Sequence, residues 1–159
     1  MEKVFQNIVE AEKTLYSADH LINVVFPIVD DKKILLKFLS EIKIAVLKCI
    51  NFILQYEYVA KKIILSSDSE INFLIFYKKC APEYGITSEE IKIIRRIFEL
   101  EKKHVQSAME FRRGAGVVIL SKDSESDIFT FDDARGFLRT GKSILGKIRD
   151  VHSLVTKKG

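Results

Sequence analysis

The sequence predicts a mainly α protein, an antiparallel helical bundle of about five helices with a small C-terminal β-hairpin. The chain has 159 residues, of which 47% are hydrophobic and 30% charged, and this apolar content suits one domain spanning residues 1–159. Residues 30–65 contain neither Pro nor Gly and repeat apolar side chains at steps of three and four. Residues 117–131 show instead the β-branched and alternating runs that are typical of a hairpin.

Residues 30–65 are expected to form the central helix. Apolar side chains cover most of its circumference and leave a narrow polar stripe, which predicts that neighbouring elements cover it on more than one side. Asp30 or Asp31 is expected to cap its first turn. A helix over residues 2–25 precedes it, and Pro27 is expected to stop that helix because the residue before a proline avoids the helical region. The short link between the two helices predicts antiparallel packing.

The length of the central helix predicts self-association. At ~1.5 Å per residue it would be about 50 Å long, whereas a compact domain of this size has a diameter of roughly 40 Å. The overhanging end is expected to be an interface in a two-fold dimer. Its apolar residues include Tyr58, Ile64 and Leu65. The alternative is a kink near Asn51 to Gln55 that folds the helix back into a compact monomer.

Each of the next two helices is expected to begin at a capping box, in which a Ser or Thr precedes a Glu by three residues. The pairs are Ser67 with Glu70 and Thr87 with Glu90, and the helices cover residues 69–80 and 88–113. Gly114 and Gly116 end the second of them.

A hairpin at about residues 117–131 and a last helix complete the chain. A two-stranded hairpin is marginal in water, so it is expected to lie on the helices or to pair its edge with a second copy. The last helix is expected to start at residues 130–132 and to run to about Val155.

One stretch of the last helix matches G-x-x-x-x-G-K-[ST], the pattern of a phosphate-binding P-loop. Its residues are Gly136, Gly141, Lys142 and Ser143. That loop must follow a parallel strand directly and open a crossover helix, whereas helical periodicity runs through both glycines here. We therefore expect this stretch to be helical, with Gly136, Gly141 and Gly146 permitting the close approach of a neighbour.

Histidine spacing gives no complete site. Glu101 and His104 form half of the Glu-x-x-His pattern of a bundle di-iron site, and the sequence lacks the second half. The chain can also be compared with HEPN domains, helical bundles that often cleave RNA, in which an Arg lies about four to six residues before a His. Arg96 precedes His104 by eight positions and Arg149 precedes His152 by three, so neither pair fits. No cofactor and no metal are expected.

Basic residues suggest a second class of partner. The net charge is +4 and the pI about 9.0, with charges of both signs alternating along the chain. Basic pairs close to aromatic residues are used by proteins that bind RNA. The candidate contacts are Arg95, Arg96, Lys102, Lys103, Arg112 and Arg113.

The location is expected to be the cytoplasm. Cys49 and Cys80 form neither a disulfide framework nor a metal spacing, which favours a reducing compartment. The N-terminal residues do not resemble a signal peptide, and the longest apolar run is far short of the ~20 residues that span a bilayer. No membrane partner is expected.

Two segments resemble small archaeal proteins of unassigned function. They are LYSADHLINVVFPIVDDKKILLKFLSEI at residues 15–42 and EFRRGAGVVILSKD at residues 110–123. The resemblance implies a long helical pair, a hairpin, a last helix and a cytosolic archaeal setting, and it transfers no catalytic residue. The leading hypothesis is a non-catalytic protein–protein interaction module that self-associates. An RNA- or ribosome-associated protein is the alternative, and a P-loop nucleotide binder or HEPN-type RNase comes third.

Overall fold

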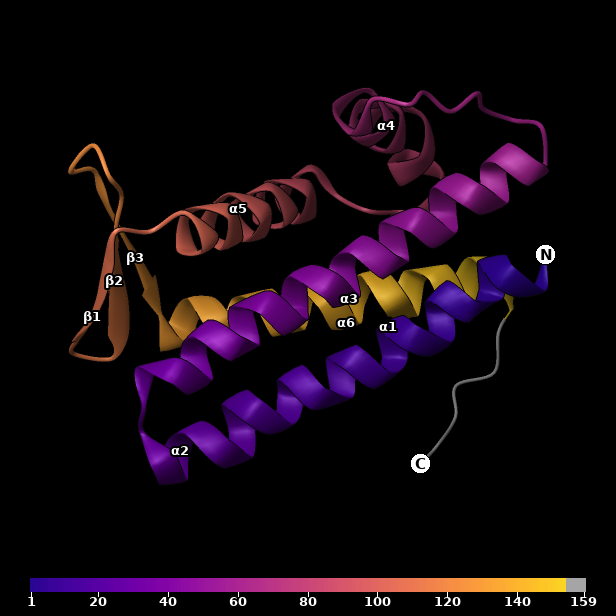
Figure 1. Ribbon diagram of the computed structural model, residues 1–159. Helices are drawn as coiled ribbons and strands as arrows, with labels where there is room; N and C mark the ends of the chain where they lie inside the picture. The colour runs from indigo at the N-terminus through magenta and orange to yellow at the C-terminus, as the bar shows by residue number, and fades with distance from the viewer. Residues whose placement is uncertain (154–159) are drawn as a thin grey trace.

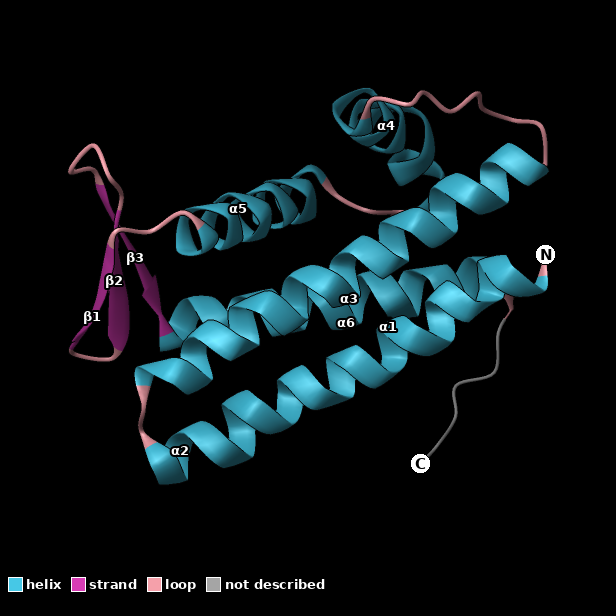
Figure 2. Cartoon of the chain, viewed as in Figure 1, coloured by secondary structure: helices cyan, strands magenta, loops and turns pink. Residues whose placement is uncertain are grey.

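The computed structural model describes residues 1–153 and confirms the predicted fold class (Figure 1; Figure 2). Three long helices lie side by side: α1 (Glu2–His20), α3 (Lys32–Val59) and α6 (Phe131–His152). A fourth, α5 (Ser88–Val105), also packs on α3, and the chain directions of α1 and α5 oppose those of α3 and α6. A three-stranded antiparallel sheet stands at one end of the bundle.

The first helical segment continues past the proline that was expected to stop it. A π-helical turn, η1 (Leu21–Val25), leads directly into α2 (Phe26–Val29), and the segment ends at Asp30 with φ +51°. Proline lacks an N–H and its ring conflicts with the carbonyl four residues earlier. A π turn has a wider hydrogen-bond spacing, and it lies immediately before the turn that contains Pro27. The predicted end of the first helical segment, Val25, therefore lies one turn before its observed end at Val29.

The central helix α3 begins as predicted and ends earlier than predicted. The Asp31 carboxylate accepts a hydrogen bond from the Lys33 N–H at 2.9 Å and caps the first turn. The helix ends at Val59, because Lys61 takes φ +61° and the Lys62 N–H donates to the Glu57 carbonyl at 2.9 Å. This turn directs Ile63 back into the core.

The prediction of an overhanging helix over residues 30–65 is therefore wrong. With 28 residues, α3 is about 42 Å long, and residues 60–65 lie outside it. A left-handed conformation costs a non-glycine residue roughly 1–2 kcal/mol, and the burial of one isoleucine side chain offsets a cost of that size.

The segment after α3 forms three short helical pieces. They are α4 (Ser69–Ile75), the π-helical η2 (Phe76–Cys80) and the 3₁₀-helical η3 (Ala81–Tyr84). Asp68 caps α4 by accepting from the Glu70 N–H at 2.9 Å, so the predicted Ser67–Glu70 capping box is not the cap. The predicted Thr87–Glu90 capping box does open α5.

The sheet contains one more strand than predicted. Strands β1 (Met109–Arg113), β2 (Gly116–Leu120) and β3 (Ser126–Thr130) pair in the order β1-β2-β3, and β2 and β3 are the predicted hairpin. The helix expected over residues 88–113 ends at Val105. Gly114, with φ +58°, starts a two-residue turn that pairs Arg113 with Gly116. The following helix α6 begins at a capping box formed by Thr130 and Asp133.

Aromatic side chains join the sheet to the bundle. The ring of Phe129 on β3 stacks on Phe38 of α3 and on Phe137 of α6, with centroid distances of 6.4 and 5.6 Å. All three rings are buried. The sheet is thus supported by the helices, as expected for a small sheet that is marginal by itself.

Candidate functional site

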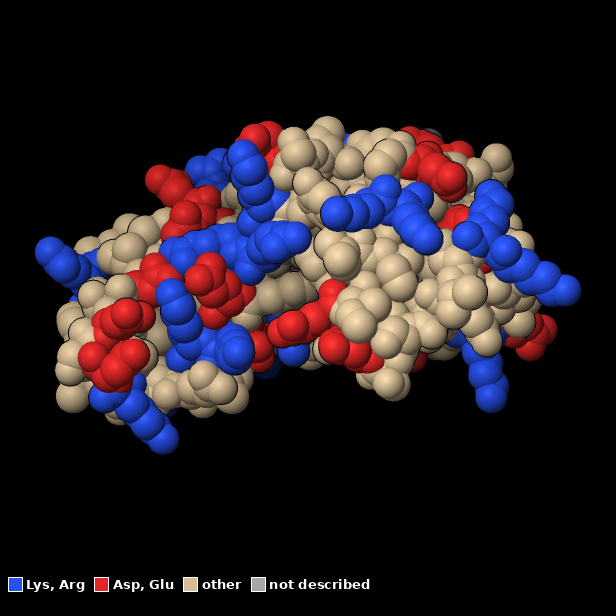
Figure 3. All heavy atoms as spheres, turned by 90° about the horizontal axis from the view of Figure 1, so that it is seen from above, with Lys and Arg blue, Asp and Glu red and all other residues tan. Residues whose placement is uncertain are grey.

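An apolar groove lies between α3, α4 and α5. Its volume is about 770 Å³. Leu47, Ile50 and Leu54 of α3 form the floor, residues 68–74 form one wall, and Arg95 and Phe98 of α5 form the other. In the view from above, uncharged residues form a broad area on the half of the molecule that contains α4, with charged side chains around it (Figure 3).

The α4 wall is apolar in sequence and open to solvent in structure. All seven residues of α4 are exposed or half-buried, although four of them are Ile, Phe or Leu. Ile71 and Leu74 are 47% and 46% exposed. On the neighbouring stretch of α3, Ile44 and Leu47 are exposed as well. A contiguous apolar surface of this kind is typical of an interaction site.

Hydrogen bonds at the start of α4 hold this wall in place. The Asn72 carboxamide accepts from the Ser66 N–H and donates to the Ser66 carbonyl, both at 2.8 Å. Asp68 caps the same turn. The helix is therefore fixed at its N-terminus, while Ile71 and Leu74 on its outer side remain exposed.

The two walls of the groove carry opposite charges. Asp68 and Glu70 lie on the α4 side and Arg95 lies on the α5 side. The Arg95 guanidinium stands over the rings of Phe73 and Tyr77, at 5.2 and 5.6 Å from their centroids. Within residues 1–153, no carboxylate lies within ion-pair distance of Arg95, and no Lys, Arg or His lies within ion-pair distance of Glu70.

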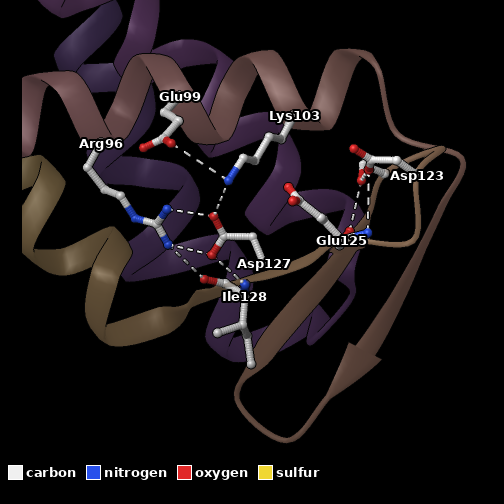
Figure 4. Close-up of polar contacts among 8 residues, drawn as sticks. Arg96, Glu99, Lys103, Asp123, Glu125, Asp127 and Ile128 are labelled. Atoms are coloured by element: carbon white, nitrogen blue, oxygen red, sulfur yellow. Dashed lines mark hydrogen bonds and ion pairs between the residues drawn. The ribbon is translucent and has the colours of Figure 1, made fainter.

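Two of the predicted RNA contacts form an internal ion-pair cluster (Figure 4). Arg96 donates through both terminal nitrogens to the two carboxylate oxygens of Asp127, each at 2.6 Å. Lys103 donates to the same carboxylate at 3.0 Å and lies 3.7 Å from Glu99. Hydrogen bonds from Arg96, and then from Lys103, hold the pKa of Asp127 well below its usual range. These two cations therefore attach α5 to β3.

The other four predicted RNA contacts are dispersed. Arg112 donates to the Asp30 carboxylate at 2.7 Å and lies over the Phe26 ring, so it attaches β1 to the end of α2. Arg95 lines the groove. Lys102 and Arg113, on α5 and β1, have no ion-pair partner in the described part of the chain. Three of the six predicted contacts are thus neutralised by carboxylates.

The P-loop pattern lies inside α6. Gly136, Gly141, Lys142 and Ser143 are all helical, and the Ser143 hydroxyl donates to Glu90 at 2.6 Å. Lys142 pairs with Asp19 on α1. These backbone amides belong to a helix, whereas a phosphate cradle uses the free amides of a loop.

Of the three glycines expected to permit close packing, Gly141 does so. A Cβ atom there would lie 2.9 Å from Leu15 Cδ2 and 3.1 Å from Ile42 Cδ1. For Gly136 and Gly146, no atom of the described residues, apart from the adjacent backbone of α6 itself, would lie within 4 Å of the added Cβ.

A buried polar chain that the sequence analysis did not identify joins α3, η3 and α6. The Tyr84 hydroxyl donates to Glu57 at 3.0 Å and lies 2.7 Å from His152 Nε2. Glu57 and Tyr84 are 4% and 3% exposed, so this chain is structural and closed to a substrate. Its residues are too far apart in sequence for a spacing rule. The one local signal was Glu57 itself, an acid one turn beyond Ile53 on the apolar side of the helix.

Burial shifts the pKa values of Tyr84 and His152 in this buried set of hydrogen-bonded side chains. Burial, and then the hydrogen bond to Glu57, raises the pKa of Tyr84 far above its usual range. Burial lowers the pKa of His152, whose ring packs against Phe5, Phe52 and Tyr56. The second carboxylate oxygen of Glu57 has no hydrogen-bond partner among the described residues, and Lys62 Nζ lies 3.8 Å from it.

The remaining histidine patterns do not converge on a site. His104 Nδ1 lies 2.5 Å from Glu110, and Glu101 lies 3.8 Å from Lys43. Arg149 pairs with Glu12 at 2.5 Å. The described residues contain no group of three His, Cys, Asp or Glu side chains placed to hold a metal ion.

The predicted interface residues lie at the far end of α3 and in the link to α4. Tyr58 is exposed, Leu65 is half-buried, and Ile64 is 83% exposed. Ile64 and Leu65 belong to the link that leads from α3 directly into α4 (Figure 1).

A comparison with protein-family models, curated proteins and solved structures finds no significant match. Among residues 1–153, no helix combines the length and apolarity that a membrane crossing requires.

Proposed function

We propose that this protein is a non-catalytic interaction module that self-associates through the groove between α3, α4 and α5. The observation that supports the proposal most is α4, an apolar helix whose side chains are all exposed or half-buried. Phe73 and Ile75 of this helix pack partly against the core, whereas Ile71 and Leu74 stay 47% and 46% exposed. Burial against another chain best explains the apolar character of these two exposed residues. A two-fold dimer is the commonest assembly for such a surface.

Ile64 belongs to the proposed contact surface as well. It is the most exposed large apolar residue of the described chain, and it precedes α4 by five positions. Burial of an apolar side chain contributes roughly 1.5–3 kcal/mol when it is complete. Ile64 together with Ile71 and Leu74 would therefore supply a sizeable part of a micromolar interaction, which corresponds to about 8 kcal/mol.

The test is the molar mass in solution as a function of concentration, measured by light scattering. The wild type should approach twice 18.3 kDa at micromolar concentration, and Leu74→Lys should remain near 18.3 kDa. Val9→Lys is the matched control, because Val9 is a similarly exposed apolar residue on α1 and lies outside the groove. A wild type that stays at 18.3 kDa at every concentration would contradict the proposal.

RNA or ribosome association remains the alternative function. Its best support is the pair Lys102 and Arg113, the two predicted contacts without an ion-pair or aromatic partner among residues 1–153. If this alternative holds, Lys102→Ala and Arg113→Ala should each weaken single-stranded RNA binding and reduce its salt dependence. Nucleotide binding by a P-loop and cleavage by a HEPN-type site have weaker support, since their motif residues lie inside helices or in ion pairs.

We also propose a cytoplasmic location, with the archaeal setting that the sequence resemblance implies. Cys49 and Cys80 are buried free thiols, and burial raises their pKa values to about 12 and about 11. They are therefore protonated and unreactive at neutral pH. Such thiols suit a reducing compartment.

A further inference from the structure

We propose that the occupant of the groove is the groove of a second copy, related by a two-fold axis that runs along it, so that Arg95 of each copy pairs with Glu70 of the other. This inference rests on the proposed function and specifies its partner and its geometry. The carrying observation is the placement of opposite charges on opposite walls of one apolar groove.

A two-fold axis along the groove exchanges its walls. When two copies meet face to face about this axis, the α4 wall of one copy lies opposite the α5 wall of the other. Glu70 and Asp68 are then opposite the partner's Arg95, and the same contact occurs twice. An axis across the groove would instead place Arg95 opposite the partner's Arg95, which like-charge repulsion disfavours.

The same arrangement also matches the apolar surfaces. Ile71 and Leu74 project from the α4 wall, and they would meet the partner's Phe98 on α5 and Leu47 on α3. Each copy thus contributes one protruding helix and one recess.

Both charged groups are available for this pairing. Arg95 is held over Phe73 and Tyr77, so its guanidinium is positioned at the groove before any partner arrives. Glu70 stands in the exposed first turn of α4, where its backbone N–H is bonded to Asp68 and, within the described chain, its carboxylate pairs with no cation. A partner that carried charges of one sign would leave the charges on one wall of the groove unpaired. A second copy carries both signs and pairs the charges of both walls.

Charge reversal tests the arrangement. Arg95→Glu alone and Glu70→Lys alone should each dimerise at least about tenfold more weakly than the wild type, because both copies of the contact become repulsive. An equimolar mixture of the two variants should recover the dimer, since one Arg95–Glu70 pair and one reversed pair form in the heterodimer. Native mass spectrometry identifies the heterodimer by its mass.

Two controls reverse charges of the same signs outside the groove. Lys92→Glu and Glu89→Lys alter a solvent-exposed pair on α5, and Glu89, like Glu70, occupies the first turn of its helix. Both should dimerise like the wild type. The neutral variants Arg95→Gln and Glu70→Gln remove one charge each without reversing it, and each should weaken the dimer and reduce its salt dependence even where a reversed variant folds poorly.

The outcomes separate this inference from the proposed function. If Leu74→Lys abolishes the dimer but the mixed variants give no heterodimer and the neutral variants keep the full salt dependence, the two-fold arrangement is wrong and the groove remains the interface. If the groove instead binds only a helix of a different protein, or the wild type is monomeric at every concentration, the second copy is rejected as the occupant.

Discussion

The hydroxyl of Tyr84 lies 2.7 Å from Nε2 of His152 and donates to the Glu57 carboxylate at 3.0 Å. Because the hydroxyl hydrogen points to Glu57, His152 must donate its Nε2–H to Tyr84. Neutral His152 therefore carries its proton on Nε2. A single hydroxyl thus connects the last turn of α3 to the last turn of α6.

Tyr84→Phe should lower the free energy of unfolding by about 1–3 kcal/mol, because it leaves a buried carboxylate oxygen without its donor. Tyr16→Phe is the control, since Tyr16 is highly exposed and its loss of a hydroxyl should have little effect. Urea unfolding at neutral pH measures both. Equal stabilities for the two variants would show that the buried chain contributes nothing.

Stability should fall as the pH is lowered through about 6.5, the ordinary pKa of a histidine. Burial lowers the pKa of His152 in the folded state below its ordinary value of about 6.5, so the unfolded chain binds more protons in this range. The contribution of neutral His152 is complete above the unfolded pKa and is lost as the pH falls toward the folded one. The groups that face the ring are Glu57, Lys62, Tyr56 and Tyr84.

Urea unfolding across this pH range is the measurement for His152. His152→Gln should flatten the dependence, and His20→Gln, at an exposed histidine, should leave it as in the wild type. A slope that is unchanged in His152→Gln would assign the pH dependence to other groups.

Asp127→Asn should destabilise the protein by roughly 1–2 kcal/mol at neutral pH. The expected loss of unfolding free energy is modest because Arg96 and Lys103 are each about one-third exposed, so that solvent screens their attraction to the carboxylate. The folded pKa of Asp127 is lowered, so its contribution is present above the unfolded value of about 3.9 and is lost as the pH falls below it. The difference between wild type and variant should therefore shrink in acid. Asp132→Asn, at an exposed carboxylate, should show no such convergence.

Local signals explain which parts of the fold the sequence could predict. Asp31 and Thr87 cap helices through contacts with the next few residues, so their patterns are visible in the sequence. The end of α3 depends on the burial of Ile63 after a turn at Lys61, and no neighbouring residue in the sequence is a typical helix-ending signal. In the same way, residues 109–113 form a strand because β2 offers a pairing edge, although their sequence continues a helical pattern.

Gly146→Ala should stabilise the protein by about 0.5–1 kcal/mol, since a helical alanine loses less conformational entropy than glycine and nothing in the described chain lies near the new methyl group. At Gly141 the same gain is opposed by overpacking against Leu15 and Ile42, which typically costs 1–3 kcal/mol. Thermal unfolding of the two variants should therefore give Gly146→Ala the higher melting temperature. The opposite order would mean that the core relaxes freely around α6.

Mg-ATP and Mg-GTP should show no binding in calorimetry. Lys142 and Ser143 are occupied by Asp19 and Glu90, and the surrounding backbone is helical. Micromolar binding that disappears in Lys142→Ala would overturn this prediction. Lys142→Ala itself should cost under about 1 kcal/mol of stability, as exposed ion pairs do.

The candidate site was less predictable than the fold because it depends on packing between distant segments. A long overhanging helix predicts an interface at Tyr58, Ile64 and Leu65, whereas the groove exists because α4 stands away from α3. The sequence predicts a helix over residues 69–80, but it does not show that Ile71 and Leu74 face solvent. The basic residues were likewise visible, but their neutralisation by Asp127 and Asp30 required the sheet to be in place.

The close contact between Gly141 and the helices α1 and α3 also bears on biosynthesis. Leu15 and Ile42 belong to the first half of the chain, and the residue that completes their packing is translated about a hundred positions later. Until α6 leaves the ribosome, the apolar surface of the paired helices α1 and α3 that α6 will cover is exposed to solvent. The nascent chain is therefore expected to be a client for chaperones that bind exposed apolar surface, and to be released by them once α6 docks.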